Sequence, residues 1–270
     1  MSPSARHAIG PPKKEAAILT VPISVVIPVK DDARLLERCL DALDGQTVRP
    51  LEVIIVDNGS TDDSAAVAHA HGARVLKEPA PGIAAASSTG YDAATGAVIA
   101  RCDADSVPPA DWLQRIAVAF ASDPALAALT GPGRFYGVSR ATAAVGAVLY
   151  MRGYFASMTV ALGHPPLFGS NAAFLASAWR AVRSGVHRHD LGMHDDVDLS
   201  VHLGPERRIR YDRRLVVDVS GRPLVDAAGM GLRARRGVRS IVAHWPGELP
   251  PHRWRARIAA DLRRRGGARP

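Results

Sequence analysis

Cysteine, aromatic residues and long apolar runs are all scarce in this chain. Its two cysteines, Cys39 and Cys102, lie in apolar segments where a buried thiol is the common case, so we expect no disulfide. No stretch reaches the ~18 uninterrupted apolar residues that a transmembrane helix needs. The nearest, residues 141–162, is interrupted by Arg152 and rich in Ala, Gly and Met, which indicates a buried or interfacial helix.

Several familiar signatures are absent as well. The sequence contains no G-x-x-x-x-G-K-[ST], no G-x-S-x-G, and no G-x-G-x-x-G after its first predicted strand. These absences disfavour a P-loop ATPase, a serine hydrolase and a dinucleotide-binding dehydrogenase. His187, His189 and His194 lie far from both cysteines, and their spacing matches no familiar zinc pattern, so we expect no zinc site there.

Positive charge is concentrated near the end of the chain. Residues 201–270 hold 17 of the 34 Lys and Arg residues but 6 of the 26 Asp and Glu residues. Seven arginines between Arg253 and Arg269, beside Trp254, suit an anionic membrane surface, an acidic partner or nucleic acid, and equally a solvated terminus. Residues 1–20 lack the apolar run of a secretory signal, which indicates a flexible segment and a cytoplasmic protein.

Short buried strands alternate with amphipathic segments through the first hundred residues. The predicted strands are 23–29, 51–56, 73–76 and 97–102, with helices after the first, second and third, including one at 84–94. This order predicts an α/β fold with a doubly wound, mostly parallel central sheet flanked by helices. Weaker strands follow at 168–174, 208–211 and 215–219. We expect one domain over 21–225 and a basic extension over 226–270.

Polar residues follow three of these strands, at the edge where a doubly wound sheet binds its ligands. Asp31 and Asp32 come after the first strand, and either could cap the next helix. Asp57 and Asn58 follow the second strand, where they could bind a nucleobase edge, although D-N-G-S is also turn chemistry and Ser60 with Asp63 resembles a capping box.

The fourth strand leads into Asp103-Ala104-Asp105. Two carboxylates this close can share one hard cation, and Mg²⁺ or Mn²⁺ fits such a site better than zinc. A second acidic group, His194-Asp195-Asp196-Val197-Asp198, could raise one carboxylate's pKa toward that of a general base. The alternative is that these acidic residues simply begin a helix, where negative charge is favoured. The periodicity of the segment fits either a helix or a strand.

Four ordered blocks of sequence together resemble the family 2 glycosyltransferases, over residues 21–222. The blocks are S-V-V-I-P-V-K-D-D (24–32) followed by G-Q-T (45–47), V-I-I-V-D-N-G-S-T-D (53–62), C-D-A-D-S (102–106), and G-S-N (169–171) with H-D-D-V-D-L-S (194–200). The resemblance implies a GT-A type fold and an inverting transfer of a sugar from a UDP-, GDP- or dTDP-sugar to an acceptor hydroxyl.

The resemblance also implies roles for individual residues. Asp196 would be the catalytic base, supported by Asp195, which replaces the family's usual Glu. Asp103 and Asp105 would bind the divalent cation, Mn²⁺ or Mg²⁺. The residues that would bind the nucleotide sugar are Pro28, Val29, Asp31, Asp57, Asn58, Asp103, Ala104, Asp105, Asn171 and Arg222.

Besides Asp195, the chain departs from the family in two places. Ser87-Ser88 stand where an Arg-Asn pair is usual, and Pro223 replaces the last arginine of a Ser-x-Arg-Arg ending. The Asp195 and Ser87-Ser88 departures support an alternative hypothesis, a non-catalytic nucleotide-sugar-binding protein. A nucleotidyltransferase is disfavoured because the loop 30–34 has no glycine.

The acceptor is a sugar, a lipid-linked molecule or a small molecule. Apolar residues in 135–166 and the basic tail favour a lipid-linked acceptor and peripheral contact with the inner face of an anionic membrane. We expect no nucleic acid partner.

Overall fold

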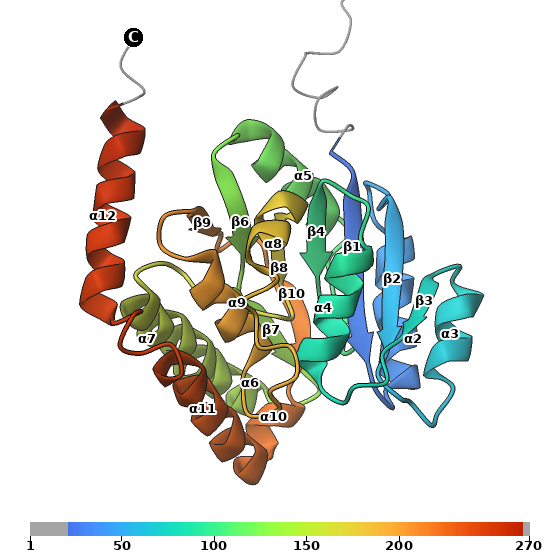
Figure 1. The fold of residues 1–270 in the computed structure, drawn as a ribbon. Coiled ribbons are helices and arrows are strands. Elements are labelled where there is room, and N and C mark those ends of the chain that lie inside the picture. Colours follow the sequence, from blue (N-terminus) through green and yellow to red (C-terminus); the bar gives the residue numbers. More distant parts are fainter. Residues whose placement is uncertain (1–20, 267–270) are drawn as a thin grey trace, which may run out of the picture.

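The computed structural model describes residues 21–266, so the predicted flexible segment 1–20 and residues 267–270 lie outside the described part. A seven-stranded sheet runs through the centre with helices on both faces (Figure 1). Its order is β3-β2-β1-β4-β8-β6-β9. The strands of this sheet are β1 (Ile23–Val29), β2 (Glu52–Asp57), β3 (Arg74–Lys77), β4 (Val98–Arg101), β6 (Leu126–Thr130), β8 (Ala172–Leu175) and β9 (Arg208–Tyr211).

Six of the seven strands have a parallel neighbour, which confirms the predicted α/β class. β3, β2, β1 and β4 pair in parallel, as do β6 and β9, whereas β8 runs antiparallel between β4 and β6. A smaller sheet of β5 (Ser106–Val107), β10 (Val217–Ser220) and β7 (Gly133–Tyr136) stands beside it. The strands predicted from the sequence all form, and their ends differ from the prediction by at most four residues.

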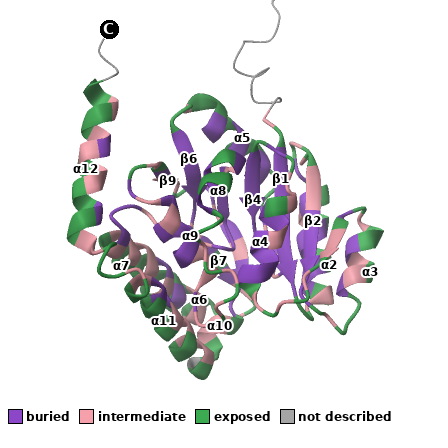
Figure 2. Ribbon diagram, viewed as in Figure 1, coloured by how far each residue is buried: buried purple, intermediate pink, exposed green. Residues whose placement is uncertain are grey.

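The sheet is buried on both sides, as its continuous apolar runs predict. Side chains of β1 alternate between two cores: Val25 and Ile27 face the core beneath α2 (Ala33–Asp44) and α5 (Trp112–Ser122). Val26 faces the second core, beneath α4 (Ile83–Ala93), α8 (Ala176–Val182) and α9 (Asp195–Leu203). Figure 2 shows the strands as the buried interior of the molecule. The polar ends of β1 and β4 are therefore held by rigid strands.

The helix starts differ from the sequence predictions in detail. Asp32 precedes α2 but makes no side-chain cap, because its carboxylate binds Arg222 instead. The predicted capping box of Ser60 and Asp63 is wrong, because α3 (Ser64–Ala70) begins later and Asp62 accepts the Ser64 N–H and hydroxyl. The acidic group at Asp195 does begin a helix, α9, so the helical interpretation of that segment is confirmed.

Helices cover one end of the molecule after β7. They are α6 (Arg140–Gly146), η1 (Ala147–Arg152), α7 (Gly153–Leu162), α10 (Arg222–Val225), α11 (Ala227–Val242) and α12 (Pro250–Gly266). The continuous helix over Arg140–Leu162 is long and apolar enough to cross a membrane by length and composition, with 22% of its most apolar window buried. A mostly buried helix is thus excluded, and by length and composition the helix fits either an interfacial or a spanning position.

Candidate active site

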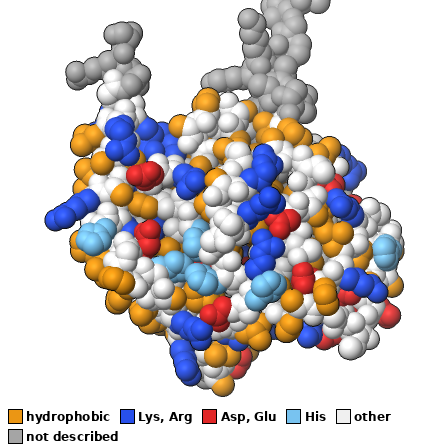
Figure 3. Space-filling view, in the orientation of Figure 1, with side chains coloured by type: hydrophobic (Ala, Val, Ile, Leu, Met, Phe, Trp, Pro, Cys, Tyr) orange, Lys and Arg blue, Asp and Glu red, His pale blue; other side chains and the backbone are white. Residues whose placement is uncertain are grey.

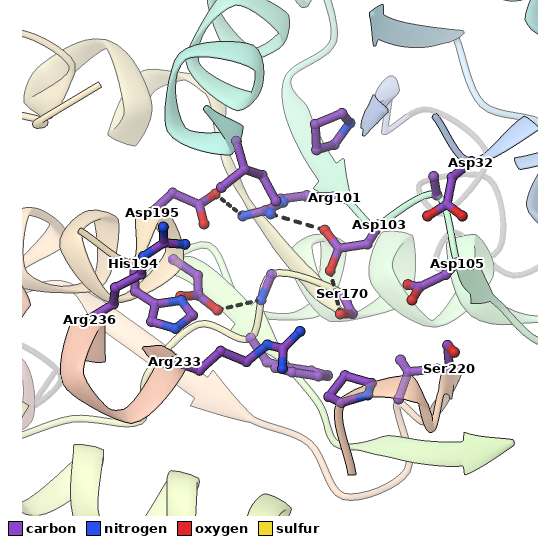
Figure 4. Close-up of a pocket in the computed structure, with 18 of the residues that line it drawn as sticks. Asp32, Arg101, Asp103, Asp105, Ser170, His194, Asp195, Ser220, Arg233 and Arg236 are labelled. Carbon is purple, nitrogen blue, oxygen red and sulfur yellow. Dashed lines mark hydrogen bonds and ion pairs between the residues drawn. The ribbon is translucent and has the colours of Figure 1, made fainter. Parts of the chain in front are cut away.

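A cavity of about 400 Å³ opens at the carboxyl ends of β1 and β4. The start of α9, the end of β10 and one face of α11 form its other walls (Figure 4). Most of the residues predicted from the sequence line this cavity. They are Pro28, Val29, Asp103, Ala104, Asp105, Asp195 and Asp196.

The Asp103-Ala104-Asp105 turn presents both carboxylates to the cavity. Asp103 accepts hydrogen bonds from the Ser170 hydroxyl at 2.6 Å and from Arg101 Nη2 at 3.0 Å. Asp105 accepts one from Arg222 Nη2 at 3.1 Å. Burial, then the nearby charge of Asp103, raises the pKa of Asp105 to about 6, although Arg222 opposes the shift. Arg101 and Arg222 balance part of the negative charge of these two acids, and a divalent cation would supply more.

Arg101 joins this turn to the acids of α9. Its side chain is 3% exposed, and Figure 4 shows the guanidinium between Asp103 and Asp195. Nη1 donates to Asp195 Oδ2, the same oxygen that accepts from the Ser87 hydroxyl at 3.2 Å. Gly169 is required above it, because a Cβ there would lie 2.8 Å from the guanidinium carbon. The arginine is thus held closely by its neighbours and balances two carboxylates.

Asp196 is positioned by backbone groups. Its Oδ2 accepts the Gly169 N–H at 3.0 Å, and its Oδ1 accepts the Val197 N–H at 2.8 Å. Burial raises the pKa of Asp196; His194 counteracts this and Asp195 adds to it. Each carboxylate oxygen keeps a free lone pair, so the group can still accept a proton from a bound molecule.

Two of the predicted residues, Asp57 and Asn58, lie outside the cavity. The Asn58 amide bonds the backbone of Glu78, Ala80 and Gly82, and Asp57 accepts the Ser60 N–H, so both brace turns. Because its polar atoms are satisfied within the fold, Asn58 is poorly placed to read a nucleobase.

Asn171 has a similar internal role. Its oxygen accepts the Trp112 indole N–H, and its Nδ2 donates to the carbonyls of Pro132 and Leu215, at 0% exposure. A contact between Asn171 and the donor is therefore not available in this geometry.

Asp31 and Arg222 stand at a second hollow beside the cavity. Asp31 has a left-handed backbone (φ 53°) and accepts the Thr61 N–H and hydroxyl. Arg222 donates to both oxygens of Asp32 and to Asp105. It thus lies within reach of Asp105, which the sequence assigned to the cation and to the donor.

The sequence interpretation missed the cationic side of the cavity. Arg101, Lys30, Arg233 and Arg236 all line it, and the last two come from α11. Nη1 of Arg233 is buried without a hydrogen-bond partner among the described residues, although the Asp226 carboxylate lies 3.9 Å from it. An i, i+3 pair of arginines was visible in the sequence, but the boundary drawn at 225/226 assigned both to the extension.

Comparisons with known proteins agree with this geometry. The model of a family described as "Glycosyl transferase family 2" matches residues 24–181. The glycosyltransferase AglE of Haloferax volcanii is 34% identical over 101 residues, which cover 34% of this chain and 33% of AglE. In the curated relatives compared, the match covers less than half of the relative's length.

Two solved structures share the fold. Glucosyl-3-phosphoglycerate synthase from Mycobacterium tuberculosis, solved with Mn²⁺, UDP-glucose and phosphoglyceric acid, has a TM-score of 0.63 at 20% identity. The match covers 88% of this chain and 85% of that one. The mannosyltransferase PcManGT from Pyrobaculum calidifontis, solved with GDP-mannose and Mn²⁺, has a TM-score of 0.59 at 22% identity, covering 93% and 77%. At such identities the likeness establishes the fold.

Proposed function

The chain belongs to glycosyl transferase family 2, and we propose that it transfers a sugar from a nucleotide-diphosphate donor to an acceptor hydroxyl, with inversion at the anomeric carbon. One observation carries this proposal: Asp103, Asp105 and Asp196 line the same cavity, although 91 residues separate the last two in the chain. The buried Arg101 fixes the two groups relative to each other.

The donor's diphosphate binds against the cationic wall of the cavity. Lys30, Arg233 and Arg236 supply positive charge there, and the Arg233 Nη1 that lacks a hydrogen bond is the strongest single support. Pro28 and Val29, at the end of β1, form the adjacent wall for the nucleotide. UDP-glucose and GDP-mannose in the two similar structures support a nucleotide sugar as the ligand class.

Asp103 and Asp105 would hold the divalent cation, Mn²⁺ or Mg²⁺. The fit is supported by two carboxylates that line the cavity, and by the raised pKa of Asp105, which burial and then the charge of Asp103 cause and which a bound cation would lower. When bound, the cation supplies charge that stabilises the leaving diphosphate. Mn²⁺ in both similar structures agrees with this choice.

Asp196 acts as the general base. The acceptor oxygen forms a bond to the anomeric carbon while the bond from that carbon to the diphosphate oxygen breaks, and the electron pair leaves with the diphosphate. The acceptor's proton moves to the Asp196 carboxylate, whose raised pKa improves its strength as a base. Arg101 pairs with Asp195, the residue beside Asp196, and so holds the start of α9 in place.

The test measures nucleoside diphosphate release from UDP-, GDP- and dTDP-sugars, with Mn²⁺ or Mg²⁺ and with sugar and lipid acceptors. We expect Asp103→Asn to lose both donor binding and release. Asp196→Asn should keep donor binding, measured by calorimetry, but lower turnover by about 10²–10⁴-fold. Asp41→Asn, an exposed acid on α2, is the matched control and should behave as wild type.

Two results would contradict this assignment. Full turnover by Asp196→Asn would show that Asp196 is not the general base. Unchanged donor affinity in Asp103→Asn would show that Asp103 does not hold the cation. A wild-type protein that binds one donor but releases nothing with any acceptor would support the non-catalytic binding protein instead.

An exposed apolar surface supports a membrane-delivered acceptor. Hydrophobic side chains with arginines among them line the edge of the molecule over α7 and α11 (Figure 3). The exposed apolar residues of this surface are Val145, Val148, Leu149 and Val160 of the helix 140–162, Leu232, Val238 and Val242 of α11, and Trp254, Ile258 and Leu262 of α12. The last three recur every four residues on one helix face, beside Arg255 and Arg263, the pattern of a helix lying on an anionic membrane.

Sedimentation with vesicles tests this contact. We expect binding to vesicles rich in anionic lipid, little binding to neutral vesicles, and a roughly tenfold loss of binding in Ile258→Ser/Leu262→Ser. Leu51→Ser replaces an equally exposed leucine elsewhere and should change nothing. Wild-type protein that fails to sediment with anionic vesicles would overturn the membrane contact and leave the transferase proposal intact.

A further inference from the structure

Three histidines and one aspartate converge outside the cavity, on the far side of α9. His187 lies in the loop before α9, Asp198 and His202 lie one turn apart within it, and His244 follows the end of α11. One ligand atom from each lies within 4.8 Å of the others. Figure 3 shows histidine side chains gathered over α9 at the surface of this view. Of the three histidines that the sequence analysis considered as zinc ligands, only His187 belongs to this cluster.

The spacing of these atoms matches a tetrahedral metal site. Asp198 Oδ1 lies 2.8 Å from His187 Nδ1, 3.2 Å from His244 Nε2 and 3.5 Å from His202 Nε2. The two Nε2 atoms are 3.3 Å apart. Ligands held about 2.0–2.1 Å from a zinc ion at tetrahedral angles are separated by about 3.3 Å. Three of the six ligand–ligand edges therefore lie within about 0.2 Å of this length, and the edge between His187 and Asp198 is about 0.5 Å shorter.

The ring of His244 is oriented from outside the cluster. Its Nδ1 lies 2.7 Å from the carbonyl oxygen of Ser240, which can only accept, so Nδ1 carries the proton. In the neutral form of the ring, Nε2 therefore carries the lone pair and faces His202 and Asp198. A backbone carbonyl that fixes one ring nitrogen in this way is the usual support of a metal-binding histidine.

Asp198 is supported in the same manner. Its Oδ2 accepts the backbone N–H of His187 at 2.8 Å, which leaves Oδ1 facing the centre of the cluster. The Asp198 side chain is 2% exposed, so the carboxylate is buried among the three imidazole rings. A buried anion surrounded by imidazoles needs one positive charge at their centre.

We propose that His187, Asp198, His202 and His244 bind a structural Zn²⁺. Three imidazoles and one carboxylate complete a four-coordinate shell, and a site without an open position holds structure together instead of activating water. Gly185 leaves room for one ligand, because a Cβ there would lie 3.0 Å from the His202 ring. The ion ties the end of α11 to α9, and so fixes the arginines of α11 relative to the helix that begins with Asp195 and Asp196.

The experiment removes metal from the full chain with a chelator, then measures zinc binding by competition with a chromophoric chelator and zinc content by elemental analysis. We expect one tightly bound Zn²⁺ per chain that persists in Asp103→Asn/Asp105→Asn, which separates it from the cation of the cavity. His202→Gln and His244→Gln should each weaken binding by at least about 100-fold. His69→Gln, an exposed histidine on α3, should bind zinc as wild type does.

Thermal unfolding gives a second readout that does not depend on activity. Zinc should raise the Tm of the wild type and of His69→Gln, and leave that of His202→Gln unchanged. The proposal is overturned if Asp103→Asn/Asp105→Asn binds no zinc, or if the histidine variants bind it as tightly as wild type. A wild type that takes up no zinc and becomes more stable as the pH falls toward 6 would also overturn it, since a proton on His244 then supplies the charge.

Discussion

The two acidic pairs that face the cavity differ in what balances their charge. Asp195 is paired with Arg101, and both side chains are at least nine-tenths buried. Asp105 is paired with Arg222, whose side chain is 56% exposed and which also binds Asp32. A buried partner is permanent, whereas an exposed one can move away at little cost. The side that we propose holds the base is therefore built before any ligand arrives, whereas Asp105, on the proposed cation side, keeps a replaceable counterion.

Removal of Arg101 tests the buried ion pair with Asp195. Of the changes considered, it should have the largest effect on stability. Arg101→Met keeps most of the side-chain volume but leaves Asp195 as an unpaired buried charge, which costs about 3–5 kcal/mol of folding free energy. Urea unfolding measures the loss. If the comparison is right, Arg101→Met/Asp195→Asn, which removes both charges, regains most of the stability. A loss below about 1 kcal/mol in the single variant would contradict the pairing.

The pH dependence of cation binding tests Asp105, whose arginine partner is exposed. The pKa of Asp105 is raised from 3.8 to about 6, so the folded protein favours its protonated form. Without a cation, this group's contribution to stability is present below about pH 4 and is lost as the pH rises through 6. The loss is on the order of 2 kcal/mol, since about 1.36 kcal/mol corresponds to one pKa unit and the group keeps some solvent contact.

A bound cation stabilises the ionised carboxylate of Asp105. The rise in Tm on adding Mn²⁺ should therefore be small at about pH 5 and large at about pH 7.5. Calorimetric scans at several pH values measure this, and Asp105→Asn should flatten the profile. An equal Tm rise at both pH values in the wild type would show that Asp105 takes no part.

Removal of Arg222 sharpens the comparison at the exposed end. Arg222→Ala frees Asp105 from a competing charge, so Mn²⁺ should bind more tightly, by up to about fivefold for an exposed ion pair. Donor affinity should fall at the same time if the guanidinium turns to the diphosphate. Calorimetry with Mn²⁺ alone and then with donor separates the two effects, and Arg49→Ala, an arginine remote from the cavity, controls for net charge.

The parts of the site that follow strands were predictable. β1 and β4 are continuously buried and, apart from Ser24 and Arg101, apolar, and a parallel sheet gathers the residues that follow its strands at one edge. That rule alone brought Asp103 and Asp105 into the cavity. It also brought in Asn58, wrongly, because a polar residue after a strand can equally well satisfy the backbone of a neighbouring loop.

The parts that depend on tertiary packing were not predictable. Arg101 occupies a strand position whose neighbours are apolar, and nothing local shows that Asp195 lies opposite it. His187, His202 and His244 are 15 and 42 residues apart, so no spacing pattern connects them, and only the packing of α11 on α9 does. Periodicity describes which face of a helix is buried, but not what that face meets.

Ser87 offers the finest test, because it stands where the family usually has arginine while Arg101 enters the same place from β4. If Arg101 supplies the positive charge of the family's usual arginine, Ser87 only completes the hydrogen bonding of Asp195. Its 3.2 Å contact is then worth about 0.5 kcal/mol. Ser87→Ala should therefore lower stability by that amount in urea unfolding and leave turnover within about twofold. Ser88→Ala, the adjacent buried serine, is the control. A hundredfold loss of turnover in Ser87→Ala alone would mean that the hydroxyl contacts the donor itself, and that Arg101 has not replaced the missing arginine.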